Sequence, residues 1–275
     1  MKGKMTKLWA YVSIALVVAS ILFLFVYVFI RGAGTITWEF LSQPPKGAIL
    51  GMEGGVWPAI VGSLCFTAVA IVLGGIPAIA AALYIVFYCE NRRIEKAFHT
   101  VIRCISGIPS IVLGLFAYSF LVRELQWGRC ILSSGVALGI MILPFVEVRA
   151  EKAFQELPKA IVLSSYALGC SKRYTIMKIV LPACKGELIS GLMLGGCYAM
   201  GATPPLIITG GVAYASIPTS LMKPAMALPL HLYLLLAQGA TSFDMAYGTA
   251  FVMMTIILIS NLLATIYAAR SHAKW

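Results

Sequence analysis

The sequence predicts an all-α integral membrane protein with six membrane-spanning helices. Of its 275 residues, 60% are hydrophobic and only 11% are charged, whereas soluble domains carry about 25% charged residues. Uncharged runs long enough to cross a hydrocarbon core of about 30 Å recur along the chain. The basic residues behind the net charge of +11 lie between these runs. This distribution fits the positive-inside rule and argues against a nucleic-acid-binding surface.

We expect residues 1–275 to form a single transmembrane domain. The expected spans cover about residues 8–30, 57–88, 101–122, 130–148, 186–208 and 246–269. The first apolar run, Leu8–Ile30, is longer than the core of a signal peptide, which is about 7–15 residues. We therefore expect an uncleaved first span and, with six spans, both termini in the cytoplasm.

Two apolar runs are too long for one upright span. Gly54–Cys89 has Gly74, Gly75 and Pro77 near its middle, which predicts a short helix outside the membrane, a break or kink, and a tilted span. Leu188–Met222 contains Thr203-Pro204-Pro205, which predicts an interruption of the fifth helix. The glycines before this interruption are spaced for close helix packing: Gly191, Gly195, Gly196 and Gly201.

A shorter apolar run, Ala225–Ala237, contains Pro229 and His231. Runs of about 10–14 residues more often lie at the interface or re-enter the membrane than cross it. We therefore do not count this segment as a span.

Residues with catalytic or metal-binding chemistry form no constellation. The seven cysteines contain no CxxC pair, and the three histidines are scattered, so we expect no metal site and no cofactor. The chain has no HExxH or GxSxG motif, and we expect no catalytic site. It also lacks the GxxxxGK[ST] loop, so any ATP must be hydrolysed by a separate chain.

The longest polar connection, about residues 150–185, predicts two short helices that meet at an elbow. Pro158 opens the first helix, which carries an apolar face, and Gly169 ends it in a left-handed conformation. Ser171 starts the second helix, which Leu181-Pro182 is expected to close. A groove on a partner protein would bury the apolar face, and so would the membrane surface. Periodicity alone does not separate these two alternatives.

The residues Gly169, Ile179, Leu181 and Pro182 have the spacing of the loop by which binding-protein-dependent permeases, the MetI-like ABC permeases, contact their ATPase. Ala167-Leu168-Gly169 also resembles that family. Where the family has Glu-Ala-Ala, this chain has Leu163-Ser164-Ser165. The resemblance implies a cytoplasmic coupling loop, with ATPase-coupling roles for these residues: Ala167, Leu168, Gly169, Ile179, Leu181 and Pro182.

Further stretches resemble the permease family of phosphate importers, PstA, over nearly the whole chain. They are Gly34–Leu41, Gly55–Gly62, Ser106–Phe116 and Ala227–Leu230. The resemblance implies a permease subunit of an ATP-driven phosphate importer in a prokaryotic cell membrane. It also implies three partners: a homologous PstC-like permease, PstB-like ATPase subunits and an external PstS-like phosphate-binding protein. The family's fifth-span signature has Arg and Glu where this chain has Tyr198 and Ala202.

Few residues at span depth suit the passage of an anion. The candidates for the translocation path are Arg103, Pro109, Thr203 and Pro204. Arg103 can serve the path or extend to the membrane surface. The prolines can expose backbone donors or merely kink a helix. Glu147, Arg149 and Glu187 flank the expected ends of the fourth and fifth spans. A permease for another oxyanion, and a membrane subunit without ATP coupling, remain alternatives.

Overall fold

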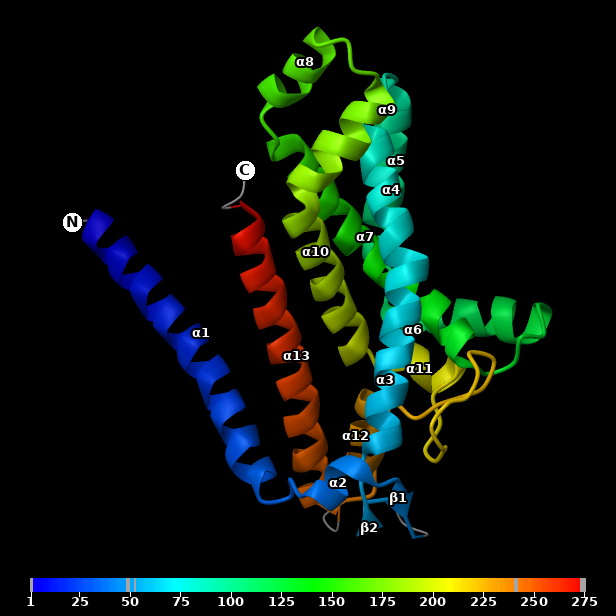
Figure 1. Cartoon of the computed structure of the whole chain (residues 1–275). Coiled ribbons are helices and arrows are strands. Elements are labelled where there is room, and N and C mark those ends of the chain that lie inside the picture. Colours follow the sequence, from blue (N-terminus) through cyan, green and yellow to red (C-terminus); the bar gives the residue numbers. More distant parts are fainter. Residues whose placement is uncertain (1, 48–49, 52, 240–241, 273–275) are drawn as a thin grey trace. The chain divides into compact units, whose positions relative to one another are not determined.

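The computed structural model describes residues 2–47, 50–51, 53–239 and 242–272, and helices dominate it (Figure 1). The longer helices are α1 (Lys2–Ala33), α3 (Trp57–Ala70), α4 (Ile76–Phe87), α5 (Arg92–Ser106), α7 (Ile131–Glu156), α10 (Leu181–Gly201) and α13 (Phe243–His272). The shorter elements are α2 (Trp38–Ser42), β1 (Pro45–Lys46), β2 (Glu53–Gly54), α6 (Ser110–Ala117), α8 (Lys159–Ala167), α9 (Lys172–Thr175), α11 (Pro204–Thr209) and α12 (Leu228–Ala237). The two strands pair antiparallel, with Pro45 opposite Gly54.

Within the described residues, five helical stretches are long and apolar enough to cross a membrane. They are Met5–Ala33, Trp57–Phe87, Ile131–Glu156, Lys172–Gly201 and Phe243–Arg270. A sixth span results if Arg92–Ser106 and Ser110–Glu124, which are bent by 97° relative to each other, form one broken span. The expected all-α membrane fold is confirmed, while the six-span boundaries stay a prediction.

The helix Trp57–Phe87 is continuous, so the prediction of a separate short helix in this run is wrong. The reason is a π-helical segment at Ile71–Gly75, in which the Ile76 N–H donates to the carbonyl of Ile71, five residues back. Such a wide turn accommodates Pro77, which lacks an N–H and whose ring would otherwise press on the preceding turn. The glycines here serve packing, because a Cβ on Gly74 would collide with the Gly139 carbonyl of α7.

The chain divides into two compact units, and α3, α12 and α13 contribute residues to both. The larger unit comprises Pro58–His231 and Thr255–Trp275. Its centre is α7, which packs on α4 and α10. Near the end of α7 that leads into α8, a buried cluster joins these helices: Ala82, Ala150, Ala153, Phe154, Val180, Cys184 and Leu188.

The smaller unit comprises Met1–Trp57 and Leu232–Met254. Its α1 meets α13 through Tyr27 and Tyr247, whose hydroxyls lie 3.3 Å apart, and through the rings of Phe29 and Phe251. Buried Leu50 packs with Leu235 and Ala246. Most of α1 is exposed and apolar, as expected of a helix whose surroundings are lipid or another membrane subunit.

The predicted interruption of the fifth helix is confirmed. Helix α10 ends at Gly201, Ala202 is extended, and α11 begins at Pro204. The predicted glycine packing is only partly confirmed. Gly195 and Gly196 are buried against Val146 and Ile71 respectively, while nothing lies within 4 Å of where a Cβ on Gly201 would be.

Candidate functional site

The expected elbow is present at the end of α7, where α8 and α9 meet within the larger unit (top of Figure 1). Pro158 precedes α8 as its N-cap, and α8 ends at Ala167. Gly169 has φ +80°, donates its N–H to the Tyr166 carbonyl at 2.9 Å, and Cys170 donates to the Ser165 carbonyl at 3.1 Å. These two bonds form a Schellman motif, which requires a left-handed residue at the Gly169 position. The prediction for Gly169 is therefore confirmed.

A buried hydroxyl pair closes the elbow across this turn. The Oγ of Ser165 on α8 lies 2.8 Å from the Oγ1 of Thr175 on α9, and both side chains are buried. The Thr175 hydroxyl also donates to the Ser171 carbonyl at 3.1 Å, so the proton between the two hydroxyls comes from Ser165. Ser165 thus stabilises the elbow through two hydrogen bonds: its carbonyl accepts in the Schellman motif, and its hydroxyl donates to Thr175.

The second half of the elbow is continuous with the fifth-span helix. Ser171 caps α9 as predicted, but the prediction that Leu181-Pro182 closes this helix is wrong, because Lys172–Gly201 is one helix of 30 residues. Another π-helical segment, Ile176–Val180, lets Leu181 donate its N–H to Ile176 and accommodates Pro182 in the widened turn. The elbow is therefore joined to α10 without a loop.

The six expected coupling residues fall into two groups. Ala167, Leu168 and Gly169 are exposed at the tip of the elbow, whereas Ile179, Leu181 and Pro182 are half-buried within the helix that continues into α10. Leu168 is 84% exposed and Leu163 is 64% exposed. Exposed leucines on a polar projection are typical of a protein contact. The coupling role of all six residues stays a prediction.

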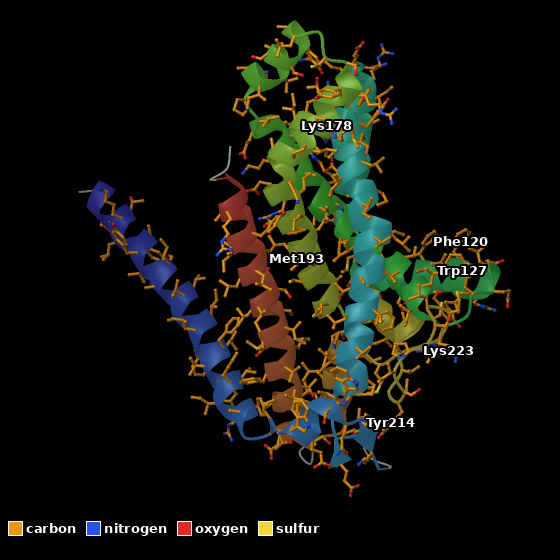
Figure 2. The ribbon with its side chains drawn as sticks, viewed as in Figure 1. Phe120, Trp127, Lys178, Met193, Tyr214 and Lys223 are labelled. Carbon is orange, nitrogen blue, oxygen red and sulfur yellow. The ribbon has the colours of Figure 1, made fainter. Side chains whose placement is uncertain are left out.

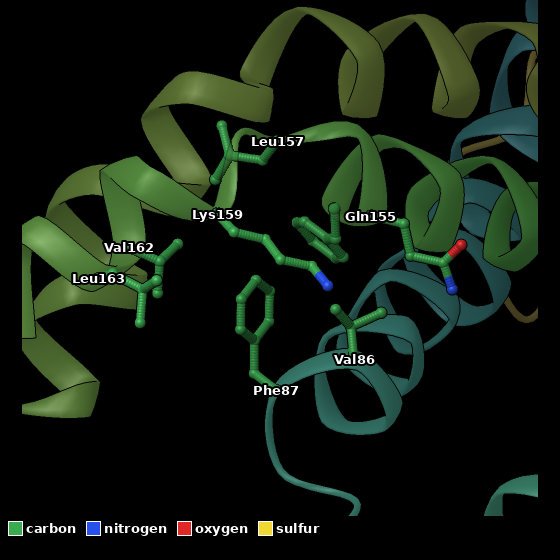
Figure 3. Close-up of a pocket in the computed structure, with 8 residues that line it drawn as sticks. Val86, Phe87, Gln155, Leu157, Lys159, Val162 and Leu163 are labelled. Carbon is green, nitrogen blue, oxygen red and sulfur yellow. The ribbon is translucent and has the colours of Figure 1, made fainter.

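An apolar pocket of about 420 Å³ lies between α8 and the ends of α4 and α7. Figure 3 shows Val86 and Phe87 on one side, Val162 and Leu163 of α8 on another, and the Lys159 side chain reaching across the space. On the other side of the elbow, the ammonium group of Lys172 lies 4.5 Å from the centre of the Tyr88 ring. Helix α8 is thus held by its hydrogen bond to α9, and its other side faces a cavity bounded by α4 and α7.

The four expected path residues do not gather at one point. Arg103 lies in the last turn of α5, and Pro109 precedes α6 at the 97° bend. Thr203 and Pro204 lie at the start of α11, which packs on α6 where Gly114 faces Pro205. Figure 2 labels Phe120 within the helical segment that begins with α6, and Trp127 just after it, where Trp127 packs back on Ala117 and Leu121. Within the described residues, no hydrogen bond or ion pair connects Arg103 with the other three.

Backbone donors at the start of α11 are fewer than expected for an anion contact. Pro204 and Pro205 have no N–H, and α11 has only six residues. The break in the fifth helix therefore presents carbonyls and an apolar surface more than donors. The roles of Thr203 and Pro204 stay predictions.

Two further polar features lie along α7. Arg149 stacks over the ring of Phe145 at 5.5 Å, and Phe145 also stacks on Tyr198 of α10 with ring centres 6.4 Å apart. Tyr198 occupies the position where the phosphate-permease signature has Arg. The second feature is Glu147, which is 0% exposed. Sequence reasoning weighed Glu147 and Arg149 but did not foresee that one is buried and the other exposed.

Sequence reasoning missed the Ser165–Thr175 pair. The available signal was Ser165 itself, which stands where the family has the second Ala of Glu-Ala-Ala. A hydroxyl in place of a methyl on a packed face needs a partner. Its partner is ten residues away and is reached only once the elbow has folded back on itself.

The comparisons with known proteins agree with this architecture. A family model described as "Binding-protein-dependent transport system inner membrane component" matches residues 78–273. The probable phosphate transport system permease protein PstA of Methanocaldococcus jannaschii is 33% identical over 207 residues, which is 75% of this chain and 73% of that protein. The phosphate transport system permease protein PstA 2 of Mycobacterium bovis is 26% identical over 267 residues, covering 95% of this chain and 86% of that protein.

Two solved structures share the fold. A bacterial ABC transporter involved in the import of the acidic polysaccharide alginate has a TM-score of 0.60 at 15% identity, covering 96% of this chain and 99% of that chain. The MetNI methionine ABC transporter in an inward-facing conformation has a TM-score of 0.59 at 15% identity, covering 79% of this chain and 94% of that chain. At such low identity these two show the fold alone.

Proteins of this kind are membrane-embedded transport subunits that work with substrate-binding proteins and with ATPase activity held in separate chains. The family model covers well over half of the 275 residues. The chain belongs to the family of binding-protein-dependent transport system inner membrane components.

Proposed function

We propose that this chain is the PstA-type permease subunit of an ATP-driven phosphate importer. The single observation that carries the proposal is the 33% identity over 207 residues with the probable phosphate permease of M. jannaschii. The proposed partners are a homologous PstC-like permease, PstB-like ATPase subunits and an external PstS-like phosphate-binding protein. The chain supplies half of the path and the site on which an ATPase subunit docks.

The proposed orientation places the elbow and both termini in the cytoplasm. Its support is the distribution of charge. The segment from Arg149 to Lys185 is rich in Lys and Arg, and so are residues 2–7 and 92–103. Basic residues near span ends favour the cytoplasmic side. A probe attached at Cys170, which is half-buried beside Gly169, tests this orientation: labelling from the outside alone contradicts it.

The elbow is proposed to act as a lever. Leu163 and Leu168 at its exposed face enter a groove of the ATPase, and closure of the ATPase subunits displaces the elbow. Because Ser165 is bonded to Thr175 and α9 continues into α10, this displacement reaches the break at Ala202–Thr203 without an intervening loop. The path then opens to one side of the membrane or the other.

Substrate passage demands replacement of the water around the anion, since an unpaired ion is far too costly in hydrocarbon. Arg103, Pro109, Thr203 and Pro204 are the proposed contributions of this chain. The charged guanidinium of Arg103 is the strongest of them, because α11 begins with two prolines and offers few N–H donors. The partner permease is proposed to supply the rest.

The test of substrate is competitive uptake. Proteoliposomes that hold the complete transporter and its binding protein are given labelled phosphate with unlabelled sulfate or molybdate in excess. Retention of phosphate uptake under both competitors is expected. Loss of uptake under one of them favours a permease for that oxyanion, the second candidate, which the Tyr198 and Ala202 departures from the phosphate signature favour.

The test of ATP coupling is Gly169→Val. Valine tolerates φ +80° poorly, so the Schellman turn and the tip of the elbow must rearrange. Loss of ATP-driven uptake and of ATPase co-purification is expected. Gly34→Val is the matched control, since Gly34 has no neighbour within 4 Å of its would-be Cβ and no left-handed φ. A membrane subunit without ATP coupling would keep the same properties in both variants.

A further inference from the structure

Glu147 is the most deeply placed acidic side chain of α7. It is 0% exposed, and neither carboxyl oxygen has a hydrogen-bond partner among the described residues. It lies in the apolar stretch Ile131–Glu156, on the helix that packs between α4 and α10. An ionised carboxylate in such a place is prohibitively costly without a cation beside it. In the conformation shown by the structure, burial therefore favours the neutral, protonated form of Glu147.

The surroundings offer Glu147 no compensating charge. The side chain of Glu151, one turn further along α7, is itself acidic and brings no positive charge. Charged or titratable side chains on the helices packed around this end of α7 include Tyr84 on α4, His99 and Arg103 on α5, Arg149 on α7, and Cys184, Lys185 and Glu187 on α10. Within the described residues none of them donates a hydrogen bond to Glu147.

A line of polar groups leads from Glu147 toward the end of α7 that carries α8. Glu151 Oε1 accepts a hydrogen bond from Gln155 Nε2 at 2.7 Å. The same oxygen lies 3.6 Å from Nε2 of His99 on α5, and the two side chains are 14% and 31% exposed respectively. A carboxylate and an imidazole are both competent proton acceptors near neutral pH. Because Glu151 follows Glu147 by four residues, on the same face of α7, it is the side chain of α7 best placed to pass the proton of Glu147 toward His99.

We propose that Glu147 is a proton-binding site that releases and rebinds a proton as the transporter changes conformation, with Glu151 and His99 as the proton's route to water. On release, the proton leaves the Glu147 carboxyl, passes to a carboxyl oxygen of Glu151, then to Nε2 of His99 and on to water, and Glu147 becomes an anion. Such an anion is tolerated only in a conformation in which water or a cation reaches it. The α4–α7–α10 contact must therefore open at this level during the cycle.

The inference rests on the chain being a transport subunit and not on the identity of the substrate. An acidic residue in a spanning helix costs folding free energy, and such residues usually have a function. A methionine or leucine would fill the same space between α4 and α10 without unmet hydrogen bonds. The unmet pair of oxygens is the observation that points to a second state.

The first experiment detects the proton directly. Infrared spectra of the full-length chain in lipid nanodiscs are expected to contain a band of a protonated carboxylic acid that exchanges slowly in deuterated water. Glu147→Gln removes this band. Glu156→Gln is the matched control, because Glu156 is exposed on the same helix beside Lys152 and its loss leaves the band in place. Absence of the band from the unsubstituted chain, or its persistence in Glu147→Gln, overturns the proposal.

The second experiment asks whether the proton moves during transport. The uptake rate of Glu147→Gln is divided by that of the unsubstituted transporter across about pH 6 to 8, so that any titration of the substrate cancels. The ratio is expected to change several-fold over this range. A ratio that stays constant, with the infrared band lost, makes Glu147 a static neutral acid and overturns the proposal.

A third variant separates the route from the site and does not depend on the folding of Glu147→Gln. Glu151→Gln leaves Glu147 in place but removes the acceptor next to it. Slower deuterium exchange of the Glu147 band, by several-fold, is expected. Unchanged exchange overturns the assignment of Glu151 to the route. Failure of phosphate competition leaves these tests interpretable, because the infrared readouts need no substrate and the uptake ratio is measured with whichever oxyanion is carried.

Discussion

The elbow and the middle of α7 each bury polar side chains, and they do so in opposite ways. At the elbow, Ser165 and Thr175 satisfy each other, and Thr175 also satisfies the Ser171 carbonyl. In α7, Glu147 is equally buried and neither of its oxygens is satisfied among the described residues. A satisfied pair specifies one geometry, whereas an unsatisfied group marks a place where one geometry is not enough. We therefore expect the elbow to keep its conformation during transport and the helix contacts around Glu147 to change.

The largest effect is expected from a third buried group, His231 on α12, which serves as a reference for the other two. Burial lowers the pKa of His231 from 6.5 to about 4. The unfolded chain therefore binds a proton that the folded chain does not, and the folded state loses stability as pH falls from about 6.5 toward 4, by roughly 3 kcal/mol. Thermal unfolding in detergent across this range measures it. His231→Phe should flatten the profile, and an equally steep profile in that variant would refute the assignment.

The next effect concerns the hydrogen-bonded pair Ser165 and Thr175, compared with variants that lack one or both hydroxyls. Thr175→Val leaves the buried Ser165 hydroxyl without its partner and should lower stability by about 1–3 kcal/mol, whereas Ser165→Ala should cost about 1 kcal/mol, because the Thr175 hydroxyl keeps its bond to the Ser171 carbonyl. The double variant should cost less than the sum, because the Ser165 hydroxyl that Thr175→Val strands is then absent. Denaturation of all four forms completes the cycle. Additive losses would mean that the 2.8 Å pair is not a unit.

At Glu147 the change in folding stability is expected to have the opposite sign, so that substitution stabilises the folded state. Glu147→Met removes the unmet oxygens and fills the same space, so the folded state should gain about 1 kcal/mol while uptake falls. The melting temperature of the purified chain gives the first value, and a transport assay gives the second. A large loss of stability would show that Glu147 has a partner, and the contrast with the elbow would disappear.

The smallest effect concerns the exposed cation–π contact between Lys172 of the elbow and Tyr88. Lys172→Gln removes the cation over the Tyr88 ring and should cost about 0.5–1 kcal/mol, since the site is exposed. Lys152→Gln is a suitable comparison, as its exposed pair with Glu156 contributes little. If Lys172→Gln uncouples ATP hydrolysis from uptake as strongly as Ser165→Ala does, the buried pair is not the main connection.

Local chemistry explains which parts of this fold the sequence could predict. Gly169, Pro158 and Ser171 act within their own turn, and the structure confirms the helix start or end predicted at each of them. At Pro77 and Pro182 the sequence predicts breaks, because a proline disrupts an ordinary helix. The structure keeps both helices intact with π-helical segments, and their formation depends on packing along the whole helix.

The candidate site was less predictable for the same reason. The exposed residues Ala167 and Leu168 follow from the turn beside them. The partnership of Ser165 with Thr175, the burial of Glu147, and the stacking of Arg149 and Tyr198 on Phe145 all depend on contacts between separate helices. No single-helix periodicity reveals which face of α7 meets α4 and which stays open.

The widened turn at Ile176–Val180 sets the rotation of the elbow about the helix axis relative to the membrane-spanning part of α10. A turn of this type holds one residue more than an ordinary one, and each residue advances a helix by about 100°. Removing a single codon there would restore regular winding and would turn the Leu168 tip by that angle relative to the membrane half of α10. The orientation of the elbow relative to α10 therefore depends on one additional residue in this turn. Natural insertions and deletions at this position should be rarer than substitutions.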